Sequence, residues 1–167
     1  LYYIMLNGIF TEGKGQITEV NIKEDYVNMI HNHINMGNNK LKVVYDCGNG
    51  TTSIVAKDIF KSTDTIEYIP LFAESDPTFP NHHPDPCVYD NLQLLKAKVL
   101  ETHADLGIGY DGDGDRVGIL DEQGNMVETD KFMIIMWRQL HDKVAKKEAM
   151  YDVKCSKALE DELNKLG

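Results

Sequence analysis

The chain has 167 residues, 42% of them hydrophobic and 26% charged, which is typical of a globular domain large enough to bury a core. Its longest strongly apolar run, Leu1–Leu6, falls far short of the ~18 residues that a membrane-spanning helix needs, so we expect no membrane partner. The 27 acidic residues outnumber the 17 basic ones, and the net charge of −10 disfavours binding to the phosphate backbone of nucleic acids.

The three cysteines, Cys47, Cys87 and Cys155, are odd in number and far apart in the sequence. This spacing argues against a disulfide framework and indicates a reducing compartment, so we expect a cytoplasmic protein. The first residue is leucine, not methionine, and the acidic net charge would repel an anionic substrate. Both features predict that the chain is a piece of a longer protein.

The first regular element is predicted to be a helix that begins near residue 21. Asn21 is a favourable N-cap residue, and Glu24 three residues later can complete a reciprocal capping box. The sequence Gly-Asn-Asn at 37–39 then ends the helix. Its predicted inward face consists of five apolar residues: Ile22, Tyr26, Met29, Ile30 and Ile34.

Strands and helices alternate along the rest of the chain. The predicted elements are, in order, strand Leu41–Asp46, helix Thr52–Lys61, strand Thr65–Pro70, helix Asn91–His103, strand Asp105–Tyr110 and strand Arg116–Asp121, which turns back toward Met126–Val127. Four prolines between residues 71 and 88 exclude a regular element there, so we expect a long ordered loop.

The last part of the chain predicts two more helices and a strand. Asp130 can cap a long helix, Met150–Lys154 is a further candidate strand, and Lys157–Leu166 is a final short helix. The inward face of the long helix is predicted to carry Met133, Trp137, Leu140 and Val144. The whole pattern indicates an α/β protein, a three-layer α/β/α domain with a mixed, mostly parallel sheet of about four strands.

The candidate functional site is the hexapeptide Asp-Gly-Asp-Gly-Asp-Arg at residues 111–116. A solvated turn is the simplest interpretation, but three carboxylates so close together repel one another unless a cation or protons neutralise them. Carboxylate oxygens from Asp111, Asp113 and Asp115 suit a hard cation such as Mg²⁺ or Ca²⁺. Arg116 adds a fork that fits a phosphate, and a divalent cation beside an arginine indicates phosphoryl transfer.

An EF-hand calcium loop is one alternative for this segment. With Asp111 at position 1 of such a loop, Asp113 and Asp115 occupy positions 3 and 5, and Glu122 occupies position 12. However, Arg116 stands where an EF-hand requires glycine. The flanking segments also predict strands, whereas an EF-hand has helices on both sides.

An aspartyl phosphatase of the haloacid dehalogenase type is a second alternative. Such an enzyme has a nucleophilic aspartate after a buried strand and another aspartate two residues later, which Asp111 and Asp113 match. Asp115 stands where that family usually has Thr or Val, and no convincing acidic pair follows residue 130. This alternative stays open but is less favoured.

Residues 40–155 resemble the second, metal-binding domain of the α-D-phosphohexomutases, in the phosphomannomutase/phosphoglucomutase branch. The resemblance is carried by Ala104–Tyr110 leading into the acidic loop, by Tyr45–Gly50 and by the proline-rich segment Phe79–Pro86. A further match, Asp152–Ser156, resembles the start of the third domain. The resemblance implies a lead-in from the preceding domain over 1–38, domain 2 over 39–150, the start of domain 3 over 151–167, and one antiparallel strand in the sheet.

The same resemblance implies a reaction. In the family, a phosphoserine exchanges phosphoryl groups with a hexose phosphate through a bisphosphorylated sugar. By position, Asp111, Asp113 and Asp115 would hold Mg²⁺, and Arg116 would act as a catalytic residue beside the phosphoryl group. The family's serine loop, its sugar-recognition loop and its phosphate site are absent from this sequence. We therefore expect other domains of the parent chain to supply them, and we expect this chain alone to be inactive.

Other polar residues are better explained by local structure. His82 and His83 lie in the proline-rich loop, where packing and hydrogen bonding are more common roles than metal ligation. The turn at Gly48–Gly50 lacks the spacing and lysine of a P-loop, so a tight structural turn is predicted. Cys87 has no evident base that would activate it as a nucleophile. The sequence assigns no residue to sugar recognition.

Overall fold

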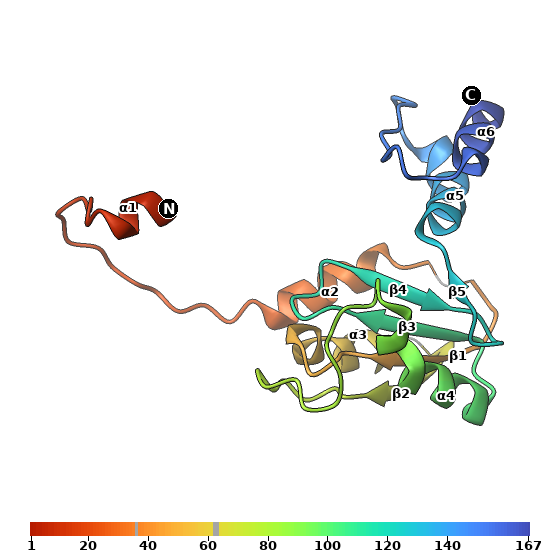
Figure 1. The fold of residues 1–167 in the computed structure, drawn as a ribbon, viewed down its shortest axis with the longest axis horizontal. Helices are drawn as coiled ribbons and strands as arrows, with labels where there is room; N and C mark the ends of the chain where they lie inside the picture. The colour runs from red at the N-terminus through yellow and green to blue at the C-terminus, as the bar shows by residue number, and fades with distance from the viewer. Residues whose placement is uncertain (36, 62–63) are drawn as a thin grey trace.

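The structure, a computed structural model, describes residues 1–35, 37–61 and 64–167. Within these ranges a five-stranded sheet has the strand order β2-β1-β3-β4-β5 (Figure 1). Its strands are β1 (Leu41–Asp46), β2 (Ile66–Leu71), β3 (Leu106–Tyr110), β4 (Val117–Leu120) and β5 (Met126–Val127). β1 is parallel to β2 and β3, while β4 is antiparallel to β3 and β5. The sheet is mixed as predicted, with β4 as the one reversed strand, and the short β5 raises the count from about four to five.

Helices cover both faces of the sheet. The α-helices are α1 (Tyr2–Leu6), α2 (Lys23–His33), α3 (Ala56–Lys61), α4 (Gln93–Thr102), α5 (Thr129–Leu140) and α6 (Lys157–Leu166). Short 3₁₀ turns occur at η1 (Thr51–Ile54), η2 (Tyr89–Leu92) and η3 (His141–Lys143). α4 packs on one face, and α3, with α2 beside it, packs on the other. The predicted α/β/α layering is therefore confirmed.

The strand β1 is the centre of the core because it is buried on both faces. Val44 packs on the face of the sheet that α4 covers, in a cluster with Leu92, Leu95, Val99, Ala104 and Leu120. Val43, Tyr45 and Cys47 contact the opposite side, where the Tyr45 ring stacks on Phe60 with 4.6 Å between centroids. A central parallel strand needs apolar residues at successive positions, which explains the run Val-Val-Tyr in β1.

The strand β2 lies at one edge of the sheet and tolerates a proline. Its predicted bounds were Thr65–Pro70, and the observed strand is shifted by one residue. Pro70 lies opposite Tyr45 in the register with β1. An edge strand has one side without a strand partner, so the missing N–H of a proline need not break the ladder.

The predicted start of α2 is wrong in detail. The helix begins at Lys23 with Ile22 as the N-cap, and no side-chain cap hydrogen bond forms there among the described residues. Asn21 instead accepts a hydrogen bond from the Lys23 N–H at 3.1 Å, one step before the helix. The predicted inward residues Tyr26 and Met29 are exposed, as is Ile22, and Val27 is buried in their place.

Three other local predictions need correction. The helix expected over Thr52–Lys61 is divided into the 3₁₀ turn η1 and the α-helix α3. Asp130 does not cap α5, because the N-cap residue of this helix is Glu128. The Asp130 carboxylate instead accepts a hydrogen bond from the Ser156 N–H at 2.9 Å. The segment Met150–Lys154 is irregular, with a turn at Val153 and Lys154, and forms no strand. The bounds Leu41–Asp46 and Lys157–Leu166 are confirmed.

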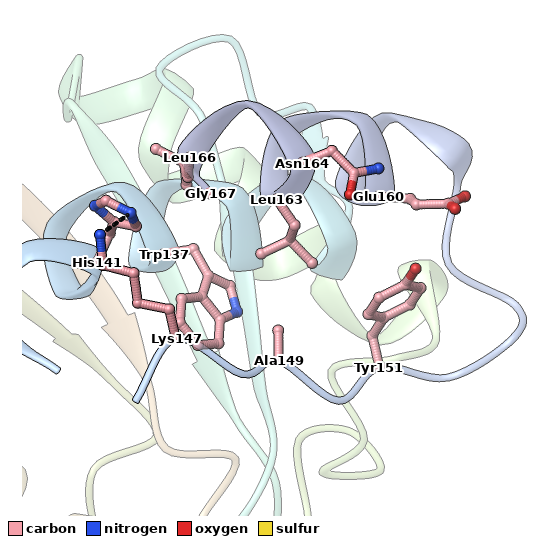
Figure 2. A pocket seen from close by; sticks show the side chains of 10 residues that line it. All are labelled: Trp137, His141, Lys147, Ala149, Tyr151, Glu160, Leu163, Asn164, Leu166 and Gly167. Carbon is pink, nitrogen blue, oxygen red and sulfur yellow. Dashed lines mark hydrogen bonds between the residues drawn. The ribbon is translucent and has the colours of Figure 1, made fainter. Parts of the chain in front are cut away.

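The helices α5 and α6 pair with each other beyond the end of the sheet (Figure 1). Arg138 of α5 donates from Nε to Glu162 of α6 at 2.7 Å. A pocket of about 340 Å³ lies between these helices and is lined by Trp137, Tyr151 and Leu163 among others (Figure 2). Of the predicted inward face of α5, Trp137 is half-buried but Leu140 is exposed. The inward face predicted for this helix is therefore wrong at Leu140.

The N-terminal segment with α1 extends away from the sheet (Figure 1). Its apolar residues Leu1–Leu6 are exposed. Among the helices of the described residues, none combines the length and the hydropathy that a membrane span requires.

Candidate metal centre in the acidic loop

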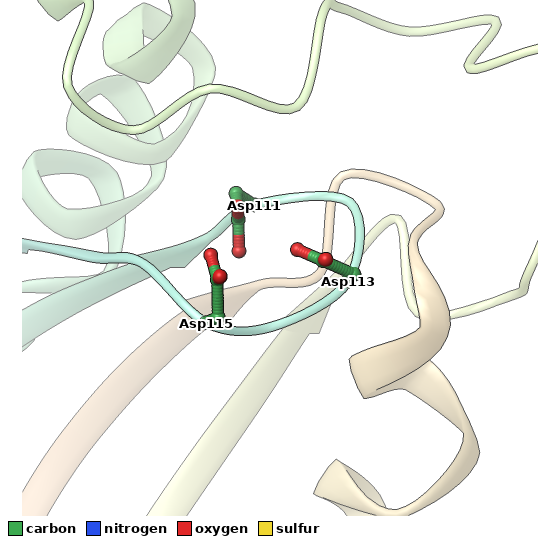
Figure 3. Close-up of side chains that lie close together, drawn as sticks. All are labelled: Asp111, Asp113 and Asp115. Carbon is green, nitrogen blue, oxygen red and sulfur yellow. The ribbon is translucent and has the colours of Figure 1, made fainter. Parts of the chain in front are cut away.

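The acidic loop connects β3 to β4 at the edge where the parallel strands end. Its three carboxylates point toward one another, and one oxygen of each lies within 4.8 Å of the others (Figure 3). Asp111, directly after the buried strand, is only 1% exposed, whereas Asp113 and Asp115 are exposed. The structure therefore brings together all three predicted ligands. Strands on both sides of the loop contradict the EF-hand alternative.

Arg116 is bound to the buried carboxylate. Its backbone N–H donates to Asp111 Oδ1 at 3.0 Å, and its Nε donates to Asp111 Oδ2 at 2.8 Å. Burial alone would raise the pKa of Asp111, but these hydrogen bonds outweigh burial and lower the pKa to about 2. Asp111 is thus a permanent anion at neutral pH, and its charge is partly compensated from within the protein.

In the part of the chain that the structure describes, the two exposed carboxylates receive weaker compensation from Arg116. The pKa of Asp115 is raised, and the largest cause is the negative charge of Asp113. The second cause is a hydrogen bond with Asp111. Arg116 Nε lies 3.8 Å from Asp115 Oδ1, too far for a hydrogen bond. The loop therefore holds more negative charge than its own arginine balances. Hard divalent cations prefer oxygen donors of this kind.

The turn after β1 fixes the position of the acidic loop. The Thr51 N–H donates to the Gly112 carbonyl at 2.9 Å, and the Thr51 hydroxyl contacts the same oxygen at 3.3 Å. Gly114 has φ of +79° and lies against the Thr52 hydroxyl, so a side chain there would be both strained and crowded. The sequence contained no signal that Thr51 and Thr52 would reach this loop.

The proline-rich loop closes over the other side of the acidic loop. Phe79 and Pro84 lie near Gly112, within 4 Å of where a Cβ on that residue would be. Asp85 accepts a hydrogen bond from Arg116 Nη1 at 3.0 Å. The three segments that carried the family resemblance therefore meet at one place. Sequence reasoning missed Asp85, although its position inside the proline-rich motif was a usable signal.

His82 takes part in hydrogen bonding within the protein, the role that the sequence favoured for it. Its Nε2 lies 3.0 Å from Asp46 Oδ2, and its Nδ1 lies 2.9 Å from the His83 carbonyl oxygen. The hydrogen bond to Asp46 is the main cause that raises the pKa of His82, against the opposing effect of burial. His83 is exposed, and its side chain is assigned no role.

The Gly48–Gly50 turn is structural and does not resemble a phosphate cradle. Its three backbone N–H groups donate within the protein, to Asp46 Oδ1, to the Phe72 carbonyl and to the Cys47 carbonyl. None of these N–H groups is therefore directed at a ligand. Within the described residues, all three cysteines are free.

Comparison with known proteins identifies a family. A family model described as "Phosphoglucomutase/phosphomannomutase, alpha/beta/alpha domain II" matches residues 24–124. A relative named phosphomannomutase/phosphoglucomutase, from Pseudomonas syringae pv. tomato, is 46% identical over 149 residues. That alignment covers 89% of this chain and 32% of the relative. A phosphoglucomutase from Neisseria meningitidis serogroup A is 32% identical over 151 residues, 90% of this chain and 32% of that protein.

Solved structures agree with the sequence comparison. A phosphoglucomutase/phosphomannomutase family protein from Burkholderia thailandensis superposes with a TM-score of 0.92 at 32% identity, covering 99% of this chain and 36% of that one. This chain thus spans about a third of the length of the relatives that it matches. Both the fold and the predicted family are confirmed. The chain belongs to the phosphoglucomutase/phosphomannomutase family, and residues 24–124 correspond to the family's alpha/beta/alpha domain II.

Proposed function

We propose that this chain is the metal-binding domain of a phosphohexomutase, which interconverts hexose 6-phosphates and hexose 1-phosphates through a phosphoserine and a bisphosphate intermediate. Family membership and the names of the relatives support this function. The observation that carries it is the meeting of three carboxylate oxygens within 4.8 Å, beside an arginine that is bound to the most buried of them.

The donor set fits a hard divalent cation. Oxygens that share an octahedral Mg²⁺ at ~2.1 Å lie roughly 3 to 4 Å apart, so oxygens within 4.8 Å need only a small contraction. We assign Asp111, Asp113 and Asp115 as the ligands and Mg²⁺ as the metal, because Mg²⁺ is the usual partner of phosphoryl groups. Bound there, the cation would neutralise negative charge on the phosphoryl group in transit.

The protein's own residues would bind and orient the phosphoryl group. Arg116 presents a planar fork of N–H donors at the rim of the loop, where its half-exposed side chain can meet phosphoryl oxygens. Asp111 fixes the guanidinium by accepting a hydrogen bond from Arg116 Nε. Thr51 fixes the loop by its bonds to Gly112, so the donors are placed before a substrate arrives.

Other parts of a longer protein would complete the site. We propose that they supply the phosphoserine, the sugar-recognition loop and a phosphate site, since this chain covers only about a third of its relatives. In this proposal residues 1–38 lead in from the preceding domain, 39–150 form domain 2 and 151–167 begin domain 3. The free cysteines support the cytoplasmic location expected from the sequence.

The test uses both the 167-residue chain and a full-length protein that contains it. We expect the chain alone to show no mutase activity with glucose or mannose phosphates. In the full-length protein, Asp113→Ala should abolish turnover while circular dichroism and thermal unfolding remain unchanged. Retained turnover would refute the assigned metal role. Hydrolysis of a generic phosphate ester by the chain alone, lost in Asp111→Asn, would favour the aspartyl phosphatase instead.

A further inference from the structure

Arg116 is held between two carboxylates from different parts of the chain. Its Nε donates to Asp111 Oδ2 at 2.8 Å, and its Nη1 donates to Asp85 Oδ1 at 3.0 Å. Asp111 belongs to the acidic loop itself, whereas Asp85 comes from the proline-rich loop. A guanidinium is planar, so carboxylates on two of its nitrogens fix its rotation as well as its position.

The Asp85 carboxylate also keeps Arg116 from pairing with Asp115. The exposed Asp115 is nearby, with its Oδ1 3.8 Å from Arg116 Nε, and it is one of the proposed metal ligands. A guanidinium held only by Asp111 could turn toward Asp115 and neutralise it. Because Asp85 draws Nη1 to the opposite loop, Asp115 stays available to a cation and Arg116 stays available to an anion.

Asp85 is placed by the local structure of the proline-rich loop. Its Oδ1, the oxygen that receives Arg116, also accepts the Cys87 N–H at 3.1 Å. Its backbone N–H donates to the His83 carbonyl at 2.9 Å, and its carbonyl accepts from Asn91 Nδ2 at 2.9 Å. The carboxylate therefore moves only if this loop moves.

His82 ties the same loop to the core of the domain. Its two ring nitrogens face the Asp46 carboxylate and the His83 carbonyl, groups that accept hydrogen bonds and cannot donate them. Both nitrogens must therefore carry protons for both bonds to form, which makes the ring an imidazolium. Asp46, at the end of β1, is 1% exposed and also accepts the Gly48 N–H at 2.7 Å.

We propose that Asp85 is a positioning residue for Arg116, and that the buried Asp46–His82 ion pair fixes the loop that carries Asp85. This inference rests on the proposed function, in which Arg116 meets the transferred phosphoryl group. It adds a chain of contacts from the end of β1 through the proline-rich loop to the acidic loop. The two loops then act as one rigid unit, with the arginine at their junction.

The test is nitrogen NMR of the guanidinium groups, because the chain has two arginines, Arg116 and Arg138. Arg138 is bound to Glu162 at 2.7 Å, remote from the acidic loop, and serves as the internal reference. In the unmodified chain, we expect slow rotation about the Nε–Cζ bond of Arg116 and separate Nη signals. Asp85→Asn keeps an oxygen for the Cys87 N–H but removes the charge, so this rotation should become about tenfold faster.

Matched variants separate positioning from folding. Asp90→Asn removes a nearby exposed carboxylate and should leave both arginines unchanged. His82→Leu should free Arg116 as Asp85→Asn does. Because His82→Leu also leaves Asp46 as an unpaired buried charge, His82→Gln, which keeps one donor toward Asp46, serves as the milder variant.

The outcome distinguishes this inference from the function on which it rests. Unchanged Arg116 rotation in Asp85→Asn would overturn the positioning role, even if the acidic loop binds Mg²⁺. Faster Arg116 rotation, with Arg138 constant and thermal unfolding unchanged, would support it. If the chain binds no Mg²⁺ at the loop, the proposed function fails, while the arginine signals still report whether Asp85 holds Arg116.

Discussion

Gly50, in the turn after β1, lies directly against Gly112 in the acidic loop. A Cβ on Gly50 would be 2.6 Å from the Gly112 carbonyl oxygen and 3.0 Å from its Cα. The same carbonyl accepts the Thr51 N–H, so the contact and the hydrogen bond reinforce each other. The end of β1 thereby sets where the candidate metal ligands lie, although residues 50 and 112 are far apart in the sequence.

The first prediction concerns this contact. Gly50→Ala should destabilise the chain by about 1–3 kcal/mol, because the backbone of the acidic loop cannot move aside as a flexible side chain would. It should also weaken Mg²⁺ binding by displacing Asp113. Urea denaturation and a Mg²⁺ titration measure the two effects. Gly13→Ala, with open space around its Cβ, is the control. Equal stability of the two variants would contradict the packing account.

The second prediction separates ligation from stability at Asp113. Its charge is the first cause of the raised pKa of Asp115, so Asp113→Asn relieves repulsion when no metal is bound. We expect the metal-free variant to be as stable as the unmodified chain or slightly more stable. Its Mg²⁺ affinity should nevertheless fall at least about tenfold, because one charged ligand is lost. A loss of stability together with unchanged affinity would assign Asp113 a structural role only.

The third prediction concerns Asp111, which should behave in the opposite way. Asp111→Asn removes the charge from a buried carboxylate that accepts two hydrogen bonds from Arg116. We expect a loss of about 1.5–3 kcal/mol in the free energy of unfolding, even without metal. Urea denaturation in the presence of a chelator measures it. A neutral effect would mean that the Asp111–Arg116 pair does not order the loop.

The fourth prediction is a pH dependence at His82. Its pKa is raised in the folded state, mainly by the hydrogen bond to Asp46, so protonation of His82 favours folding. This stabilisation is fully present below the unfolded pKa of about 6.5 and is lost as pH rises through the folded pKa. The stability difference between the unmodified chain and His82→Gln should therefore be larger at pH 6 than at pH 9. A difference that is constant with pH would show that folding leaves the pKa of His82 unshifted, so that the charged pair with Asp46 adds no stability.

Elements with strong local signals were predicted well from the sequence. The β-branched run Leu41–Asp46 and the amphipathic segment Lys157–Leu166 have the predicted bounds. The carboxylates of Asp111, Asp113 and Asp115, the predicted ligands, also converge as expected, since the glycines between them let the backbone bend so that the three side chains meet.

The predictions that failed concern residues whose structure depends on a contact with a residue far away in the sequence. Asp130 has a side chain that is favourable at a helix N-cap, but its carboxylate accepts a hydrogen bond from the Ser156 N–H instead. Met150–Lys154 has strand-forming residues, but it lies beside α5 and α6, away from every strand edge. The Asp85–Arg116 and Asp46–His82 pairs join residues more than thirty positions apart, so the motif around Asp85 was visible in the sequence but the partner of each residue was not.

Whether the acidic loop binds a divalent cation can be measured by Mg²⁺ titration of the isotopically labelled chain. Backbone amide NMR detects millimolar binding, which suits a site that we expect other domains to complete. We predict saturable shifts at Gly112 and Gly114 that are lost in Asp113→Asn. Shifts that do not saturate, or that persist unchanged in Asp113→Asn, would show that the acidic loop is not a cation site.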